Sequence, residues 1–343
     1  MSNEIKCIIW DLDHTIWDGV LLEDEEVTLK PGIVGIIKQL DNRGILHSIA
    51  SKNNFNHAMR KLEEFGLSEF FLYPEINWNP KSESISKIQK SLNIGIDSLL
   101  FIDDQAFERD EVKFAYPDIT CMDVLEYDSL LNNSRLKHKY VTEDAQRRRL
   151  MYVQDQQRRE EEEKFIGTPE AFLASLNMTL IISQAQEEDL TRAIELTERT
   201  NQLNTTGYTY SYDELNWFRT SDQHILFVCE LVDYYGSYGK IGLALVEIKE
   251  SCYHLNLLLM SCRVMSRGVG TILLSYIMQM AKSNNKILLA DFKKTDKNKM
   301  MYVTYKFANF KEVSTGADGI TVLSNDLSSI QKFPPYVKVE TKS

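Results

Sequence analysis

The chain has 343 residues, a hydrophobic content of 43% and a formal net charge of −11, values that favour two globular domains of ordinary composition. The acidic balance argues against nucleic acid as the main partner. Five scattered cysteines without CxxC spacing, apolar runs too short for a bilayer and an N-terminus (MSNEIK) without a signal pattern argue against a disulfide framework, a zinc site and a membrane partner, and predict a cytoplasmic protein.

The first third of the chain alternates apolar runs with helical patterns. Short β-branched runs, typical of buried strands, are found at residues 5–10, 45–51 and 98–103. Apolar residues at helical spacing are found at residues 31–44, 56–66 and 82–93. Strands that alternate with helices imply right-handed crossovers and a parallel sheet. In such a sheet, ligands bind at the carboxyl ends of the strands.

Residues 141–165 are almost entirely charged or polar and predict a solvated connecting helix. From about Thr179 the strands follow one another, over residues 179–183, 225–232, 241–248, 253–262 and 286–292, with helices over 187–200 and from about 268. Consecutive strands with flanking helices indicate an antiparallel meander in an α+β domain. We therefore predict one domain over residues 1–140, a linker helix over 141–168 and a second domain over 169–343.

Carboxylates gather at the ends of two predicted strands. Asp11 and Asp13 follow the first strand, on the same face of an extended chain because side chains alternate, and Asp103 and Asp104 stand at the end of another. A carboxylate at the end of a buried strand is costly unless it is paired or bound to metal. A hard cation such as Mg²⁺ would relieve the repulsion among four acids. The alternative is that these acids only cap the adjacent helices.

A hydroxyl and an ammonium group complete this predicted site. Ser51 follows the second strand and Lys81 precedes the third helix, and such groups beside a metal form a cradle for phosphate. Asn53, in the same SKNN motif as Ser51, is a further candidate for phosphate binding. The segments between Asp11 and Ser51, and between Ser51 and Lys81, leave no room for a cap domain. We therefore expect an open site, which suits a bulky or protein-tethered substrate.

The order DxDxT, Ser, Lys and DD resembles the haloacid dehalogenase (HAD) superfamily of phosphohydrolases over about residues 5–125. The resemblance implies a capless, Rossmann-like parallel-sheet domain. In it, Asp11 would be the nucleophile that forms an aspartyl phosphate, and Asp13 the general acid and base. Ser51 and Lys81 would hold the phosphoryl oxygens. The resemblance assigns Mg²⁺ to the Asp11, Asp103 and Asp104 side chains and the Asp13 backbone carbonyl.

Several segments resemble the FkbH-like proteins over nearly the whole chain, namely DLDHTIWDGV, SKNN, FIDDQAFERDEV, RRRLMY, TNQLNTTGYTY and SCRVMSRGVG. The resemblance implies transfer of a glyceryl unit from 1,3-bisphosphoglycerate to the phosphopantetheine thiol of an acyl carrier protein, with phosphate release, in polyketide or hybrid biosynthesis. A related three-carbon acyl group is the alternative. Two positions depart from the family pattern: Ala50 stands where a cysteine precedes the serine, and Asp18 stands where a glycine is usual.

The segment Arg267-Gly268-Val269-Gly270 precedes a predicted helix, where backbone amides and the helix dipole bind phosphate. It resembles the corresponding loop of the GCN5-related N-acetyltransferase (GNAT) fold, which cradles a pantetheine pyrophosphate, and NKMMYVTYKFANFKEV resembles the end of that fold. The resemblance implies that the phosphopantetheine arm is bound by Arg263, Arg267, Gly268 and Gly270. The alternative is that the loop only starts a helix.

Three further features of the sequence have two interpretations each. Cys262 is either the thiol of an acyl-enzyme intermediate or a small buried hydrophobic residue. The polar residues within 201–206 either hydrogen-bond a ligand amide or form a turn. The arginines of the connecting segment form either a solvated helix face or a stripe that docks an acidic carrier protein, and they are Arg147, Arg148, Arg149, Arg158 and Arg159.

We therefore predict an acyl-loading enzyme that couples glyceryl transfer to dephosphorylation. One alternative is a plain Mg²⁺-dependent phosphatase that acts on a small or carrier-bound phosphoester. Another is a non-catalytic scaffold for a carrier protein, or an acyltransferase that uses acyl-CoA through its second domain.

Overall fold

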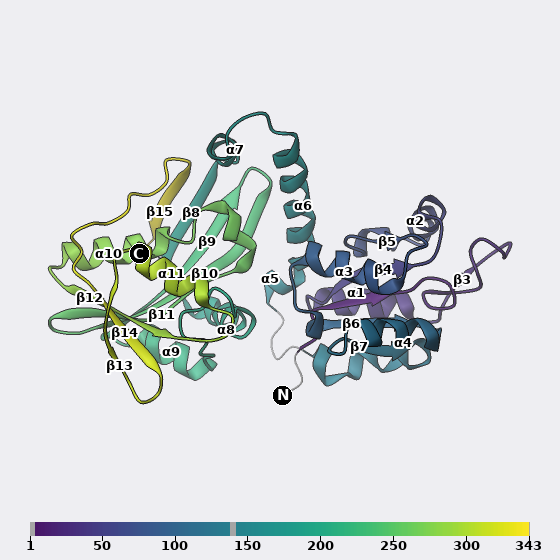
Figure 1. Cartoon of the computed structure of the whole chain (residues 1–343), viewed down its shortest axis with the longest axis horizontal. Helices are drawn as coiled ribbons and strands as arrows, with labels where there is room; N and C mark the ends of the chain where they lie inside the picture. The colour runs from purple at the N-terminus through teal and green to yellow at the C-terminus, as the bar shows by residue number, and fades with distance from the viewer. Residues whose placement is uncertain (1–3, 138–141, 343) are drawn as a thin grey trace. The chain divides into compact units, whose positions relative to one another are not determined.

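The computed structural model describes residues 4–137 and 142–342 and divides into two compact units, Met1–Gln156 and Gln157–Ser343. Figure 1 shows them as the purple-to-blue and the green-to-yellow parts of the chain. The predicted boundary at residues 140 and 141 lies outside the described residues. Within the described ranges, no helix combines the length and the apolar character needed to cross a membrane.

A parallel sheet of five strands forms the centre of the first unit, in the order β5-β4-β1-β6-β7. Its strands are β1 (Cys7–Trp10), β4 (Leu46–Ser51), β5 (Glu75–Ile76), β6 (Leu99–Asp103) and β7 (Thr120–Asp123). Its helices are α1 (Ile33–Asn42), α2 (Phe55–Glu64), α3 (Lys81–Leu92) and α4 (Ala106–Ala115). Both faces of the sheet are buried, because Ile8 packs into one apolar cluster and Ile9 into another. Burial on both faces explains why these strands read as continuous apolar runs.

A short hairpin follows β1 and carries Asp18. It consists of β2 (Trp17–Asp18) and β3 (Thr28–Leu29), and the Asp18 carboxylate lies 2.6 Å from the Lys30 ammonium. Within residues 4–137, the connections between β1, β4 and α3 hold this hairpin, two α-helices, one 3-10 helix and β5. None of these is a cap domain, so the prediction of a capless first domain is confirmed.

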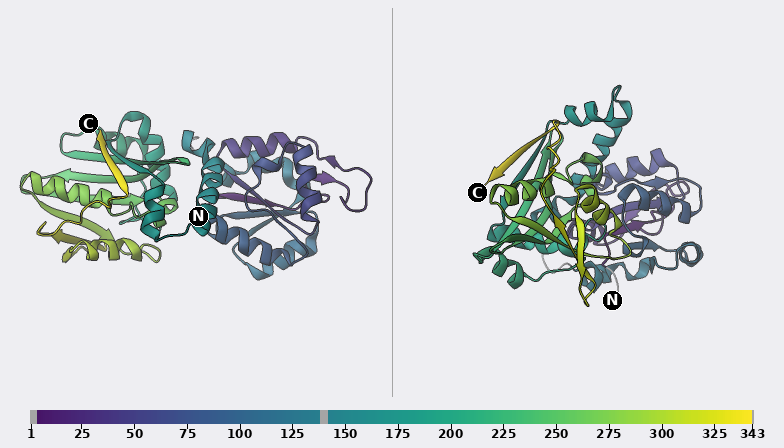
Figure 2. Two further views of the ribbon diagram at one scale, coloured as in Figure 1. Left: turned by 90° about the horizontal axis from the view of Figure 1, so that it is seen from above. Right: turned by 60° about the vertical axis from the view of Figure 1, so that its left-hand side comes forward.

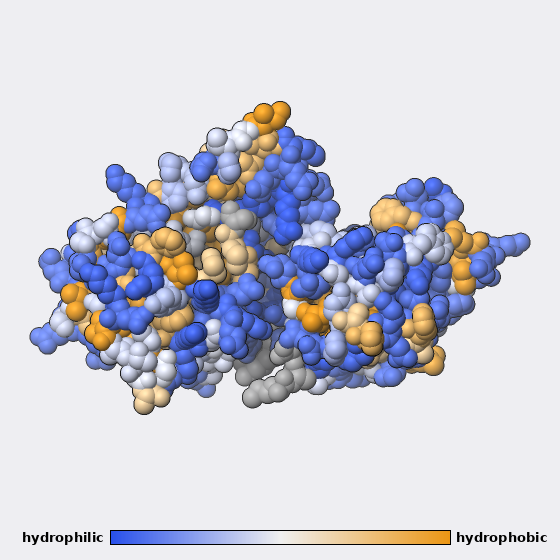
Figure 3. All heavy atoms as spheres, in the orientation of Figure 1, coloured by the Kyte–Doolittle hydropathy of each residue, from blue (hydrophilic) through white to orange (hydrophobic). Residues whose placement is uncertain are grey.

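The connecting segment forms the short helix α5 (Glu143–Gln146) and the longer helix α6 (Arg148–Lys164), and Figure 3 shows a largely hydrophilic surface over this region. The first half of α6 is bound to the first unit. The Arg148 guanidinium donates to the Gly44 carbonyl at 2.7 Å, and Arg149 Nε lies 3.1 Å from the Asp41 carboxylate. The chain divides between two glutamines inside this helix, not at its ends.

The second half of α6 is bound to the second unit through a buried ion pair. Arg158 Nε and Nη2 donate to the Asp233 carboxylate at 2.7 and 2.8 Å, and the Arg158 side chain is 1% exposed. The Tyr238 hydroxyl donates to the same carboxylate at 2.9 Å, and the guanidinium stands 3.9 Å from the centre of the Tyr238 ring. The predicted docking stripe is therefore wrong for Arg148, Arg149 and Arg158, whose guanidinium groups bind the protein itself.

The second unit contains a sheet of eight strands in the order β13-β14-β12-β11-β10-β9-β8-β15. Its strands are β8 (Met178–Gln184), β9 (His224–Asp233), β10 (Gly236–Ile248), β11 (Cys252–Met260), β12 (Ile287–Lys293), β13 (Lys311–Thr315), β14 (Ile320–Asn325) and β15 (Val337–Lys342). The helices around it are α7 (Pro169–Ser175), α8 (Leu190–Arg199), α9 (Tyr212–Thr220), α10 (Ile272–Ser283) and α11 (Lys299–Phe307). Figure 2 shows this sheet from two further sides.

The strand pairings of this sheet combine a meander with two parallel contacts. The strands from β8 to β11 pair antiparallel in chain order, as the sequence predicted. By contrast, β12 runs parallel to β11 and β15 runs parallel to β8. The meander was predicted because its strands are consecutive in the chain. The two parallel pairs were not predicted, because a helix or a long stretch of chain separates their strands.

The neighbouring strands β11 and β12 pair over only about half their length, from Cys252 to Leu255 on β11. Residues 203–206 fill the gap beyond this point. The Thr205 amide donates to the Leu258 carbonyl of β11 at 3.0 Å, and the Lys293 amide of β12 donates to the Thr205 carbonyl at 3.0 Å. Since Asn204 and Thr205 are fully buried, the polar cluster binds the protein's own backbone, which favours the structural interpretation of that sequence.

Candidate active site

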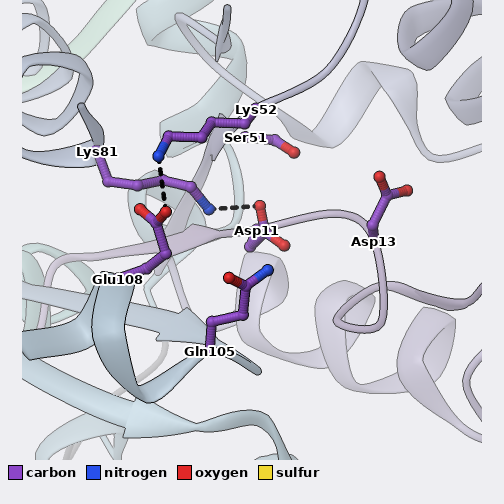
Figure 4. Close-up of a pocket in the computed structure, with 7 residues that line it drawn as sticks. All are labelled: Asp11, Asp13, Ser51, Lys52, Lys81, Gln105 and Glu108. Atoms are coloured by element: carbon purple, nitrogen blue, oxygen red, sulfur yellow. Dashed lines mark hydrogen bonds and ion pairs between the residues drawn. The ribbon is translucent and has the colours of Figure 1, made fainter. Parts of the chain in front are cut away.

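Predicted site residues from four segments meet at one edge of the first sheet. Asp11 follows β1, Ser51 ends β4 and Asp103 ends β6, and the carboxyl ends of these parallel neighbours lie together. Lys81 is the first residue of α3. Figure 4 shows the pocket at this edge, which is lined by Asp11, Asp13, Ser51, Lys52, Lys81, Gln105 and Glu108.

The Lys81 ammonium group stands between two buried carboxylates. Its Nζ lies 2.6 Å from Asp11 Oδ1 and 2.6 Å from Asp103 Oδ2, and the side chain is 4% exposed. Burial alone would lower the pKa of Lys81, but the charges of Asp11 and Asp103 outweigh it and raise this pKa above its ordinary value. The two carboxylates thus favour the charged form of Lys81, which links the ends of β1 and β6.

The carboxylates around Lys81 carry more negative charge than the single ammonium group can neutralise. Burial raises the pKa of Asp11, although the Lys81 charge and hydrogen bonds from Lys81 and Ser51 oppose the shift. Burial and then the charge of Asp11 raise the pKa of Asp103, and burial and the charge of Asp103 raise the pKa of Asp104. One lysine does not compensate three acids, so the group attracts further positive charge.

The three acids Asp11, Asp103 and Asp104 fit a divalent cation. Each offers a carboxylate oxygen, and these oxygens lie within 4.8 Å of one another. Among the described residues, Asp104 Oδ1 is buried without a hydrogen-bond partner, as expected of an atom whose partner is an ion. A set made only of oxygen donors suits a hard cation such as Mg²⁺. The structure thus brings together the three side chains that were predicted as metal ligands, and the prediction for Asp13 concerned its backbone carbonyl.

The fourth, Asp13, has its side chain fixed by other groups. Its Oδ1 accepts hydrogen bonds from Trp17 Nε1 at 2.8 Å and from the Leu21 amide at 3.0 Å, and its Oδ2 accepts one from Asn53 Nδ2 at 2.9 Å. These three donors hold the carboxylate at the pocket in one orientation. Asn53, which the sequence suggested as a phosphate ligand, is buried and bonded to Asp13. The hairpin after β1 therefore positions the predicted acid and base.

Three further polar residues line the pocket and were not predicted from the sequence. Lys52 follows Ser51, Gln105 follows Asp104, and Glu108 lies in the first turn of α4. The Lys52 ammonium lies 2.7 Å from Glu108 Oε1. Their positions after the ends of β4 and β6 could have indicated these residues, because ligands bind at the carboxyl edge of a parallel sheet.

Apolar side chains are exposed in the segments that follow the same strand ends. Leu22 lies in the hairpin after β1, Phe55 begins α2, Trp78 precedes α3, and Phe107 lies in the first turn of α4. We call these four residues the apolar border. Large apolar side chains that are exposed in this way are typical of contact with a larger molecule.

Comparisons with known proteins find relatives for each half of the chain. No family model matches. Human magnesium-dependent phosphatase 1 is 25% identical over 143 residues, which are 36% of this chain and 80% of that protein. The N-terminal part of protein BF1531 from Bacteroides fragilis, described as containing a phosphatase domain complexed with Mg, is 33% identical over 39% of this chain and 40% of its own, with a TM-score of 0.35.

A solved structure of the ribosomal-protein-S18-alanine N-acetyltransferase from Escherichia coli is 14% identical, over 45% of this chain and 97% of its own, with a TM-score of 0.35. Three features identify the fold of the first unit. Its sheet is parallel, polar residues gather at the carboxyl edge of that sheet, and residues 4–137 contain no cap domain. Its fold is HAD-like. The second unit, in which a meander continues into the parallel β11–β12 pair, is GNAT-like. The predicted fold class is thus confirmed.

The GNAT-like domain holds the remaining predicted site residues. Cys262 and Arg263 begin a 3-10 helix that ends at Arg267, and Cys262 is half-buried against the apolar core. Packing is therefore the interpretation of Cys262 that the structure favours. Arg267 is 2% exposed, and its Nη1 lies 3.3 Å from Glu162 Oε2. The Arg267 guanidinium thus lies inside the protein, although the resemblance suggested a contact with phosphopantetheine.

The glycine loop before α10 has a shape that requires Gly268. Its φ of 68° is left-handed, and a Cβ on this residue would collide with the Tyr336 hydroxyl. Gly270 follows, and α10 begins at Ile272, whose amide donates to the Val269 carbonyl at 3.1 Å. The predicted loop is present, and one of the amides at the start of the helix is already bonded within it.

Replacing Asp104 with asparagine (Asp104→Asn) is expected to weaken Mg²⁺ binding to the HAD-type domain at least about tenfold, because one charged oxygen ligand is lost. Bound Mg²⁺ stabilises the folded protein in proportion to the logarithm of its concentration over Kd. The shift in melting temperature on addition of Mg²⁺, with calorimetric titration, measures the loss. The exposed Asp110 on α4 offers a matched control, Asp110→Asn. Equal Mg²⁺ affinity in the two variants would contradict the site.

Proposed function

We propose that the protein is a Mg²⁺-dependent phosphatase and acyltransferase. In this proposal it loads a glyceryl unit from 1,3-bisphosphoglycerate, or a related three-carbon acyl phosphate, onto the phosphopantetheine thiol of an acyl carrier protein. The observation that carries the phosphatase part is Asp11 at a strand end, bonded to Lys81 and grouped with Asp103 and Asp104. The motif resemblance over nearly the whole chain supports the acyl transfer.

The chemistry at phosphorus follows from the positions of the pocket residues. Asp11 attacks the phosphorus atom of a phosphoester, the bond to the leaving oxygen breaks, and an aspartyl phosphate forms. Asp13, held by its three donors, gives a proton to the leaving oxygen and then takes one from the water that releases phosphate. Lys81 and Ser51 hold the phosphoryl oxygens. A bound Mg²⁺, held by Asp11, Asp103 and Asp104, would neutralise the negative charge of the phosphoryl group.

The proposed acyl transfer takes place before the phosphoester is hydrolysed. The carrier thiol attacks the carboxyl carbon of the acyl phosphate, the bond from that carbon to the phosphate oxygen breaks, and a thioester forms while phosphate leaves and the thiol proton passes to it or to water. Hydrolysis of the remaining phosphoester through Asp11 leaves a glyceryl thioester. The lack of a cap domain within residues 4–137 and the exposed apolar border support a substrate that a protein presents. We assign the phosphopantetheine arm to the glycine loop of the GNAT-like domain, through Gly268, Gly270 and Arg263.

A plain phosphatase is the second candidate. The specific observation in its favour is that the residues proposed as nucleophile, acid and base, phosphate-binding cation and metal ligands all lie in the first domain. The similarity to a magnesium-dependent phosphatase over this domain agrees with it. It predicts turnover of small phosphomonoesters without any thiol acceptor.

Incubation with freshly prepared 1,3-bisphosphoglycerate, Mg²⁺ and a holo acyl carrier protein distinguishes the two candidates. Intact-protein mass spectrometry of the carrier and assay of free phosphate are the measurements. The proposal expects a glyceryl mass increase on the carrier together with phosphate release. Phosphate release without modification of any holo carrier tested would favour the plain phosphatase. A protein that binds Mg²⁺ but releases no phosphate from any of these compounds would refute both.

A further inference from the structure

The pocket contains a second lysine that the mechanism above does not use. Lys52 comes from the loop after β4, and Glu108 comes from the first turn of α4, so the chain folds two distant segments together to pair them. Figure 4 shows their ion pair beside the one between Lys81 and Asp11. All four residues line the same pocket. A substrate whose phosphoryl group is bound at Asp11 therefore lies in the same pocket as Lys52.

The two lysines of this pocket differ in access to solvent. The Lys81 side chain is 4% exposed and lies between two carboxylates. The Lys52 side chain is 39% exposed, while its partner Glu108 is 8% exposed. Among the described residues that line the pocket, Lys52 is thus the cation that a dissolved anion reaches first. Because the Lys52 side of this ion pair is exposed, water screens the attraction, and a substrate anion can compete with Glu108 for the ammonium group.

We propose that Lys52 determines specificity by binding a second anionic group of the substrate, apart from the phosphoryl group that reacts at Asp11. Glu108 holds the Lys52 ammonium beside the pocket in the free protein and shares it with the ligand in the complex. The proposal rests on the proposed phosphate chemistry of the same site. The substrate class is compact phosphoesters that carry a second carboxylate or phosphate, as the acyl phosphate donor does before its acyl group is transferred.

A simpler role for Lys52 makes a different prediction. If Lys52 only neutralises Glu108, its removal leaves a negative charge in the pocket that repels any phosphate, whatever else the substrate carries. Removing both charges together would then restore normal binding. If Lys52 contacts the substrate, removing both charges leaves the second anionic group without its partner.

Two ligands of nearly equal size test the proposal, 3-phosphoglycerate and glycerol 3-phosphate. They share the phosphoester and differ in a carboxylate against a hydroxymethyl group. Calorimetric Kd values with Mg²⁺ are measured on the full chain for wild type, Lys52→Met, Glu108→Gln and the double variant, each carrying Asp11→Asn so that the esters are not hydrolysed during the titration. Lys87→Met is the matched control, because Lys87 is exposed and pairs with Glu75 outside the pocket lining. Turnover of both esters is measured in parallel with Asp11 intact.

We expect wild type to bind 3-phosphoglycerate about tenfold or more tighter than glycerol 3-phosphate, since a hydrogen bond between charged groups has this strength. Lys52→Met and the double variant should lose this preference, and Glu108→Gln should increase it, while Lys87→Met keeps it. A preference that survives in Lys52→Met, or returns in the double variant, would overturn the proposal. Absence of turnover in wild type contradicts the proposed phosphatase chemistry instead, because the preference in binding is measured without turnover.

Discussion

Replacing Asp11 with asparagine (Asp11→Asn) is expected to lower phosphate release by about 10³-fold or more, because an amide does not attack phosphorus as a carboxylate does. The protein should stay folded. Lys81 keeps its contact with Asp103, and the variant carries one fewer negative charge in a crowded group of acids. The measurement is the rate of phosphate release from a small phosphomonoester at saturating Mg²⁺, with circular dichroism as the check on folding.

Asp18→Asn is the matched control for Asp11→Asn, since it makes the same chemical change seven residues further along the chain. Asp18 lies on the hairpin and pairs with Lys30, and the pocket lining does not include it. Its rate should stay within about twofold of wild type, as is usual for an exposed change. If Asp11→Asn kept more than a tenth of the wild-type rate, Asp11 would not be the nucleophile.

Replacing Arg158 with methionine (Arg158→Met) is expected to lower the free energy of unfolding of the GNAT-like domain by about 3–5 kcal/mol. Removing one partner of a buried ion pair leaves the other charge without compensation. Asp233 would then keep hydrogen bonds from the Tyr238 hydroxyl and two backbone amides but would have lost the guanidinium. Urea denaturation followed by tryptophan fluorescence and circular dichroism measures the change.

The same helix provides the control for Arg158→Met. Lys164 is exposed and pairs with Glu161 one turn away, so Lys164→Met should change the free energy of unfolding by less than about 0.5 kcal/mol. Removing both buried charges, in Arg158→Met with Asp233→Asn, should cost less than Arg158→Met alone, because no uncompensated charge remains and the amide oxygen still accepts hydrogen bonds. A loss below about 1 kcal/mol for Arg158→Met would show that the pair does not anchor α6.

Much of the first domain follows from local sequence patterns. The apolar runs that end at Trp10, Ser51 and Asp103 predicted three parallel strands, because strands buried on both faces need apolar residues at every position. The motif residues that follow those runs were then placed at one edge. The pair of Lys52 and Glu108 was not predictable, because it joins residues 56 positions apart and depends on how α4 is oriented.

The anchoring of α6 was missed for a related reason. An arginine within a polar helix has the sequence signature of a solvated residue, and only its partner shows otherwise. Asp233 stands 75 positions after Arg158 and is the last residue of strand β9. The hairpin of β2 and β3 was missed because its strands are two residues each, too short to show an alternating pattern.

The pairing of β15 with β8 determines how the sheet of the GNAT-like domain ends. Without β15, the strand β8 would present open amides and carbonyls beside the buried side chains of Met178, Leu180 and Ile182, an edge of the kind that recruits other chains into aggregates. The strand that lies there instead is short and carries Lys338 and Glu340. Charged side chains on an outermost strand oppose its extension by a neighbouring molecule, so this border of the sheet protects the protein against polymerisation.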